Sequence, residues 1–136
     1  MSKPRIVIDT NVFLVILSRN SPHNWILKKL INQDFEICLT TSVLLEYEEI
    51  ITRFMGLRAA EAVLGLLENL TNAHFIQTYF EFRLLSDADD NKFVDCAIAG
   101  GADFILTEDK DFKMLNNYDF PKVSIINIEG FKKLMP

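Results

Sequence analysis

The fold is decided by the stretch Arg5-Ile-Val-Ile-Asp9-Thr10-Asn11 near the start of the chain. Three consecutive branched apolar residues, 6–8, predict a short strand that is buried on both faces, as the strands of a parallel sheet are. Ligands of open α/β sheets collect beyond the carboxyl ends of the strands. Asp9 stands at such an end. Acidic residues that follow the other strands are therefore candidates for the same site.

The length of 136 residues predicts one domain, spanning 1–136. A composition of 49% hydrophobic and 24% charged residues is typical of a soluble globular protein. The sequence shows no secretory leader and no apolar run of the roughly 20 residues that cross a membrane, so we expect a cytoplasmic protein with no membrane partner. Cys38 and Cys96 lack a metal-type spacing, and we expect both to be buried reduced thiols.

The acidity of the chain is concentrated in one segment. The formal net charge is −5, from 19 acidic and 14 basic residues. Residues 81–111 hold nine of the acids and three of the bases, which leaves ten acids and 11 bases, a net +1, elsewhere. Such a segment is either a solvated acidic loop or a set of oxygen ligands for a hard divalent cation.

Apolar periodicity predicts strands that alternate with helices. The expected strands are 5–8, 35–39, 73–77, 104–107 and 123–126. The first expected helix follows its cap Thr10 and has Phe13, Leu14 and Leu17 on its apolar side. The other expected helices are 22–31, capped by Ser21 with Pro22 first; 43–54; 57–70; 91–100, with Gly101 as C-cap; and 128–134. Segment 79–85 is expected to be irregular, and 108–115 to be a turn with a short helix. Strands separated by helices form βαβ units, which predicts one parallel sheet with helices on both faces.

Acidic residues follow the strands or begin the neighbouring helices at four places. They are Asp9; Glu46, on an inward-facing helical stripe; the run Asp87-Ala-Asp-Asp90; and Asp109, in the turn after the fourth strand. One acid at a helix start is more often a cap than a ligand. Four such places at one edge of a parallel sheet predict a shared site.

Converging carboxylates with no basic residue to neutralise them would bind Mg²⁺ or Mn²⁺. His23 and His74 lie away from these positions, which argues against zinc. A carboxylate–metal site suits phosphodiester hydrolysis, because the cation activates water and stabilises the leaving oxygen. Lys92 and Lys110 are close enough in sequence to bind the nucleic-acid backbone nearby.

The chain resembles the PIN-domain nucleases, and within them the bacterial and archaeal toxins of toxin–antitoxin pairs. Four motifs in order carry the resemblance over nearly the whole chain: Ile-Val-Ile-Asp9-Thr-Asn11, Thr41-Ser-Val-Leu-Leu-Glu46, Asp87-Ala-Asp-Asp90-Asn-Lys-Phe93 and Gly101-Ala-Asp-Phe-Ile-Leu-Thr107-Glu-Asp109-Lys-Asp111-Phe. The resemblance implies a three-layer α/β/α sandwich around a mainly parallel five-stranded sheet. It also implies a Mg²⁺- or Mn²⁺-dependent ribonuclease that often forms homodimers.

The resemblance assigns roles by position. The catalytic and metal-binding acids would be Asp9, Glu46, Asp90 and Asp109. Asn11 and Thr107 would line or brace the site, and Asp111 would support it. Asp87 or Asp89 could take the place of Asp90, which is preferred for its position at a helix start. Glu108 departs from related sequences, which often carry a small residue there.

The predicted function is cleavage of single-stranded RNA by a Mg²⁺- or Mn²⁺-dependent endoribonuclease, the toxin of a toxin–antitoxin pair. A phosphatase of the haloacid-dehalogenase type needs a second aspartate where this chain has Asn11. The alternative left open is a catalytically weak PIN domain that acts as an RNA-binding or protein-interaction module. An antitoxin could bind the helical surface of 43–70, where Leu57, Val63, Leu66 and Leu67 exceed the needs of one core face.

Overall fold

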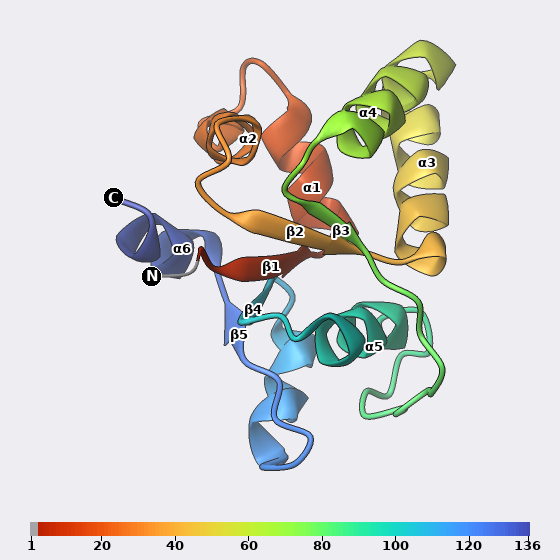
Figure 1. The fold of residues 1–136 in the computed structure, drawn as a ribbon, viewed down its shortest axis with the longest axis vertical. Coiled ribbons are helices and arrows are strands. Elements are labelled where there is room, and N and C mark those ends of the chain that lie inside the picture. Colours follow the sequence, from red (N-terminus) through yellow and green to blue (C-terminus); the bar gives the residue numbers. More distant parts are fainter. Residues whose placement is uncertain (1–2) are drawn as a thin grey trace.

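A five-stranded sheet forms the centre of the computed structural model, which describes residues 3–136 (Figure 1). All strand pairs are parallel, and the strand order is β3-β2-β1-β4-β5. The strands are β1 (Arg5–Ile8), β2 (Glu36–Leu39), β3 (Ala73–Phe75), β4 (Phe104–Leu106) and β5 (Ile125–Ile126). The predicted parallel sheet is confirmed, although four of its strands are shorter than the sequence indicated.

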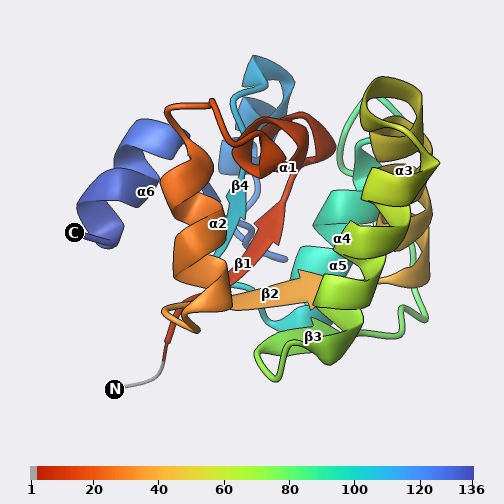
Figure 2. The same ribbon diagram turned by 90° about the horizontal axis from the view of Figure 1, so that it is seen from above.

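Helices cover both faces of the sheet and make the three-layer sandwich that was predicted. They are α1 (Thr10–Leu17), α2 (Asn24–Ile31), α3 (Thr41–Met55), α4 (Leu57–Asn69), α5 (Asn91–Gly100), the 3₁₀ helix η1 (Lys110–Asn117) and α6 (Ile128–Leu134). Figure 1 shows α1–α4 on one side of β1 and β2 and α5 on the other. Figure 2 shows α6 beside α2, where Phe131 stacks against Trp25 with ring centroids 6.0 Å apart.

The central strand β1 fixes the position of Asp9. Ile6, Val7 and Ile8 are all 0% exposed, so both faces of β1 contribute to the core. Burial of each such side chain stabilises the fold by about 1.5–3 kcal/mol. Ile8 pairs in register with Leu106 of β4. Both strands end at this pair. The residues that follow them, Asp9 and Thr107, therefore lie at the same edge of the sheet.

Three predicted helix starts are wrong by one or two residues. Thr10 is the first residue of α1 rather than its cap, and Asp9 holds the N-cap position without a side-chain capping bond. Helix α2 begins at Asn24, because the Ser21 hydroxyl accepts a hydrogen bond from the His23 N–H at 3.0 Å and closes a turn before the helix. Helix α3 begins at Thr41, and its cap is Thr40.

The two cysteines are free and buried, as the sequence predicted. Burial raises the pKa of Cys38 to about 11, so its thiol stays protonated at neutral pH. Within residues 3–136, no helix combines the length and the apolar character needed to cross a membrane.

Candidate metal centre

One pocket at the carboxyl edge of the sheet brings together acids from four separate segments. Its volume is about 320 Å³. The acidic residues that line it are Asp9, Glu46, Glu49, Asp89, Asp90 and Asp109. Thr10, Asn11 and the basic residue Arg53 line it as well. All four acids that the resemblance assigned as metal ligands therefore share one cavity, and the predicted supporting residue Asn11 lies at its exposed side.

Asp9 is the most deeply buried of these acids, with 5% of its surface exposed. The hydroxyl of Thr107, the residue that follows β4, donates a hydrogen bond to Asp9 Oδ2 at 2.8 Å. Burial raises the pKa of Asp9, and the charges of Asp109 and Glu46 raise it further, whereas the hydrogen bond from Thr107 acts in the opposite direction. Thr107 therefore orients the carboxylate of Asp9 and offsets part of the cost of burying its charge.

Three carboxylates form the tightest group at the pocket. Asp90, Asp109 and Asp111 each offer an oxygen, and these oxygens lie within 4.8 Å of one another. The turn after β4 sets this geometry, because the Asp109 N–H donates to Thr107 Oγ1 at 3.0 Å and the Asp111 N–H donates to Asp109 Oδ1 at 2.9 Å. The group contains Asp111, to which the resemblance assigned only a supporting role, and does not contain Asp9 or Glu46.

Asp90 stands at the N-cap position of α5 but makes no side-chain capping bond. Its carboxylate is thus not committed to the helix, and burial raises its pKa to about 6, with further contributions from the charges of Asp87, Asp9, Asp109 and Glu46. Asp87 is exposed, and its Oδ1 accepts the Asp89 N–H at 2.9 Å. Of the three acids in this run, Asp90 is the one whose carboxylate lies in the tight group.

Glu46 is held by two partners that the sequence did not suggest. The hydroxyl of Thr10 donates a hydrogen bond to its Oε2, and Lys92 Nζ lies 2.8 Å from its Oε1. The expectation that no basic residue neutralises the acids is therefore wrong, because Lys92 reaches across from α5 to α3. Contact of Lys92 with RNA stays a prediction, and in this structure its ammonium group is engaged with Glu46.

Lys110 and Glu108 lie beside this pocket rather than within it. Both line a neighbouring cavity between η1 and β5, together with Lys113 and Asn127. Lys110 is exposed and follows Asp109 in the sequence, so its side chain can contact a phosphate group that lies next to Asp109. Glu108 Oε1 accepts the Ile128 N–H at 3.4 Å, so this additional acid points toward the start of α6.

The residues present fit a hard divalent cation. Carboxylate oxygens are the ligands that Mg²⁺ and Mn²⁺ prefer, and three of them lie close enough to contact one ion. Burial and the neighbouring carboxylates raise the pKa of Asp90, and a bound cation would favour its charged form. Neither histidine lines the pocket.

The parallel sheet and the carboxylates at its carboxyl edge place this chain among the α/β proteins that have an acidic site of the kind that binds metal ions. A sequence profile described as the PIN domain matches residues 5–111, which covers β1 to the turn that carries Asp109 and Asp111. The chain belongs to the PIN-domain family. No curated protein matches the chain.

Solved structures share this fold at low sequence identity. VapBC2 from Rickettsia felis, bound to a DNA fragment from its promoter, is 15% identical with a TM-score of 0.64 over 90% of this chain and 98% of that one. Mycobacterium tuberculosis VapC20, described as a sarcin–ricin loop cleaving toxin, is 17% identical with a TM-score of 0.59 over 79% and 92%. The RRP44 PIN domain of T. brucei is 13% identical with a TM-score of 0.56 over 96% and 80%.

Proposed function

We propose that this protein is an endoribonuclease that cleaves single-stranded RNA with Mg²⁺ or Mn²⁺. The observation that carries the proposal is the group of Asp90, Asp109 and Asp111, whose oxygens lie within 4.8 Å of one another. Asp90 and Asp109 of this group line the same pocket as Asp9. VapC20, which has a similar fold, is described as cleaving the sarcin–ricin loop, an RNA target. Such a substrate would place the protein in the cytoplasm.

The side chains of this chain divide the work of the proposed site. The acids would hold the cation, Thr107 keeps the Asp9 carboxylate in place, and Thr10 and Lys92 fix Glu46. A bound Mg²⁺ or Mn²⁺ would supply a Lewis acid that activates water, stabilises negative charge on the leaving oxygen and, by offsetting part of the charge of the acids, gives a phosphodiester oxygen a positive centre to approach. Lys110 is exposed beside Asp109 and would contact the backbone of the RNA.

We infer an antitoxin partner from the exposed apolar side chains of α3 and α4. Leu57 is 59% exposed and Phe54 is 66% exposed at the junction of these helices. The prediction that Leu67 is part of this surface is wrong, because its side chain is 0% exposed and belongs to the core. Val63 packs against the same core. VapBC from Salmonella typhimurium and FitAcB from Neisseria gonorrhoeae have similar folds at 14% and 12% identity, with TM-scores of 0.59 and 0.55. A homodimer stays a prediction.

One observation favours a catalytically weak protein that acts as an RNA-binding or protein-interaction module. The ion pair with Lys92 removes part of the negative charge that Glu46 would offer to a cation. Against it, Asp90, Asp109 and Asp111 keep their carboxylates together without a basic partner among the ion pairs of residues 3–136. We therefore favour the nuclease.

The proposal is tested with end-labelled, unstructured RNA and single-stranded DNA oligonucleotides of identical base sequence. Each is incubated with the purified protein and Mn²⁺, Mg²⁺ or a chelator. Cleavage of RNA that the chelator abolishes is the expected result. Cleavage that survives the chelator would exclude the proposed chemistry, and binding of RNA without cleavage under every metal condition would favour the interaction module.

A further inference from the structure

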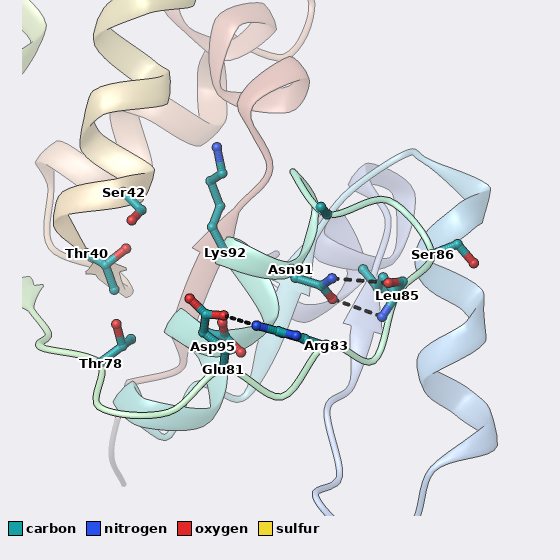
Figure 3. Close-up of a pocket in the computed structure, with 11 residues that line it drawn as sticks. Thr40, Ser42, Thr78, Glu81, Arg83, Leu85, Ser86, Asn91, Lys92 and Asp95 are labelled. Carbon is teal, nitrogen blue, oxygen red and sulfur yellow. Dashed lines mark hydrogen bonds and ion pairs between the residues drawn. The ribbon is translucent and has the colours of Figure 1, made fainter.

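A second pocket adjoins the candidate metal centre, and none of the proposed metal ligands lines it. Its volume is about 560 Å³, which is within the range of pockets that bind small organic groups. It lies between the start of α3, the segment 78–88 and α5 (Figure 3). Most of its lining is polar, with the hydroxyl groups of Thr40, Ser42 and Thr78 on one side and Asp95 of α5 on the other.

Asp95 is a buried carboxylate at the wall of this pocket, with 8% of its surface exposed. Its Oδ1 accepts the Phe82 N–H at 3.0 Å, which ties segment 78–88 to α5. The hydrogen bonds of residues 3–136 give its Oδ2 no donor. Because this oxygen is not fully enclosed by the protein, it can accept a hydrogen bond from an N–H group that a ligand brings into the pocket.

Lys92 joins this pocket to the candidate metal centre. Its side chain lines the pocket, and its ammonium group contacts Glu46 on the other side. Asp90 holds the N-cap position of α5, and Asp95 lies about 1.4 turns further along this helix, on a different face. Because Lys92 extends from the pocket to Glu46, the pocket lies next to the candidate metal centre, and a strand whose phosphate lies at that centre would have a neighbouring base at the pocket.

We propose that the pocket binds one base of the RNA next to the cleaved bond, and that Asp95 accepts a hydrogen bond from an amino group on that base. Adenine, cytosine and guanine carry such an amino group, and carboxylates accept from it. Uracil instead presents a single N–H between two carbonyl oxygens, and these oxygens would face the carboxylate. The site thus disfavours uracil at one fixed position. This inference rests on the proposed function, because it assigns the specificity of the same site.

The test compares the wild-type protein with Asp95→Asn and the matched control Asp119→Asn. The Oδ1 of an asparagine at position 95 can still accept the Phe82 N–H, so the variant keeps the loop in place and changes only what the pocket offers to a base. Asp119 is exposed and outside both pockets, so its variant repeats the change of charge elsewhere. Cleavage sites are mapped in an RNA pool of random sequence with Mn²⁺.

The expected result is a depletion of uridine, about tenfold, at one fixed position beside the cleaved bond in wild type and in Asp119→Asn. Asp95→Asn is expected to lose this depletion while still cleaving. The same site distribution in wild type and Asp95→Asn, or no base preference at a fixed position, overturns the inference while the metal-dependent cleavage stands.

A binding experiment separates the inference from the proposed function. Anisotropy of labelled r(A), r(C) and r(U) 12-mers is measured with Mn²⁺ in the Asp9→Asn background, where the cation can still attract the RNA and no cleavage is expected. Tighter binding of r(A) and r(C) than of r(U), lost in Asp95→Asn, supports the pocket even if the protein proves not to cleave RNA. Equal binding of the three oligonucleotides, or no binding, overturns it.

Discussion

Lys92 of α5 and Glu46 of α3 form an ion pair with 2.8 Å between Nζ and Oε1. The pair bridges two helices that lie on opposite sides of the sheet edge (Figure 1). Both side chains are about four-fifths buried, so the pair is screened less than one at the surface. It sets how much of the negative charge in the pocket is left for a cation.

Removing the charge of Lys92 is expected to strengthen metal binding. Lys92→Gln frees Glu46 and leaves the pocket one unit more negative, which favours the binding of Mn²⁺ by roughly 1 kcal/mol, about a fivefold to tenfold lower Kd. Titration calorimetry measures the effect. Lys122→Gln, at an exposed position outside the pocket, serves as the control. A higher Kd for Lys92→Gln would show that the lysine supports the site instead of competing with the cation.

Asp111 is expected to be a metal ligand rather than a peripheral acid. Its oxygen belongs to the group with Asp90 and Asp109, so Asp111→Asn replaces a charged ligand with a neutral one. The Kd for Mn²⁺ should rise by at least about tenfold. Asp119→Asn makes the same change at an exposed position away from the pocket. Equal Kd values for the two variants would remove Asp111 from the site.

Thr107 is expected to stabilise the fold as well as the site. Its hydroxyl donates to Asp9 and accepts the N–H of Asp109, and Thr107 is only 4% exposed. Thr107→Val keeps the shape but leaves the buried Asp9 carboxylate without this donor, which should lower the free energy of unfolding by about 1–3 kcal/mol. Urea denaturation measures it, with the exposed Thr71→Val as control. A loss no larger than that of the control would show that the hydrogen bond carries no net stability.

Glu36 is expected to stabilise the protein only above acidic pH. Burial alone would raise the pKa of Glu36, but the nearby imidazole of His74 and the hydrogen bond from Arg5 outweigh burial and hold the pKa below the usual 4.5. Arg5 Nε and His74 Nε2 lie 3.0 and 3.2 Å from Glu36 Oε1. A lowered pKa in the folded state gives stability that is present above the unfolded pKa and is lost as the pH falls through the folded one.

Glu36→Gln is therefore expected to be less stable than wild type at pH 7, by up to about 1 kcal/mol. The difference should shrink as the pH falls below 4.5 and through the lowered pKa of the folded state. Urea denaturation at pH 7 and at a series of acidic pH values measures it, and Glu48→Gln, at an exposed position of α3, controls for the loss of one negative charge. A difference that is constant with pH would mean that the carboxylate charge contributes nothing.

The features that the sequence predicted well depend on local chemistry. Three branched apolar residues before Asp9 sufficed for a buried parallel strand, and Gly101 occupies the left-handed C-cap position of α5, with φ of 62°. The convergence of Asp9 and Asp109 also followed from the sequence, because parallel strands end at a common edge. Once the register of β1 and β4 is known, the contact between Asp9 and Thr107 follows as well.

The features that the sequence could not predict depend on how separate elements pack. Lys92 follows Asp90 by two residues, and nothing in that spacing shows that its side chain reaches α3. Asp111 enters the carboxylate group because hydrogen bonds within the turn fold it back onto Asp109. Asp95 has no motif around it, and its burial beside a polar pocket appears only when segment 78–88 is placed against α5.

The central claim is that a cation held by the carboxylates at the end of β1 performs the cleavage. The most direct measurement is the rate at which Asp9→Asn cleaves unstructured RNA with saturating Mn²⁺, alongside a circular-dichroism melt of the same variant. The account predicts a loss of at least about a hundredfold in rate with a folded protein, because one buried charged group at the reacting centre is replaced by a neutral one. A folded Asp9→Asn that cleaves as fast as wild type would contradict it.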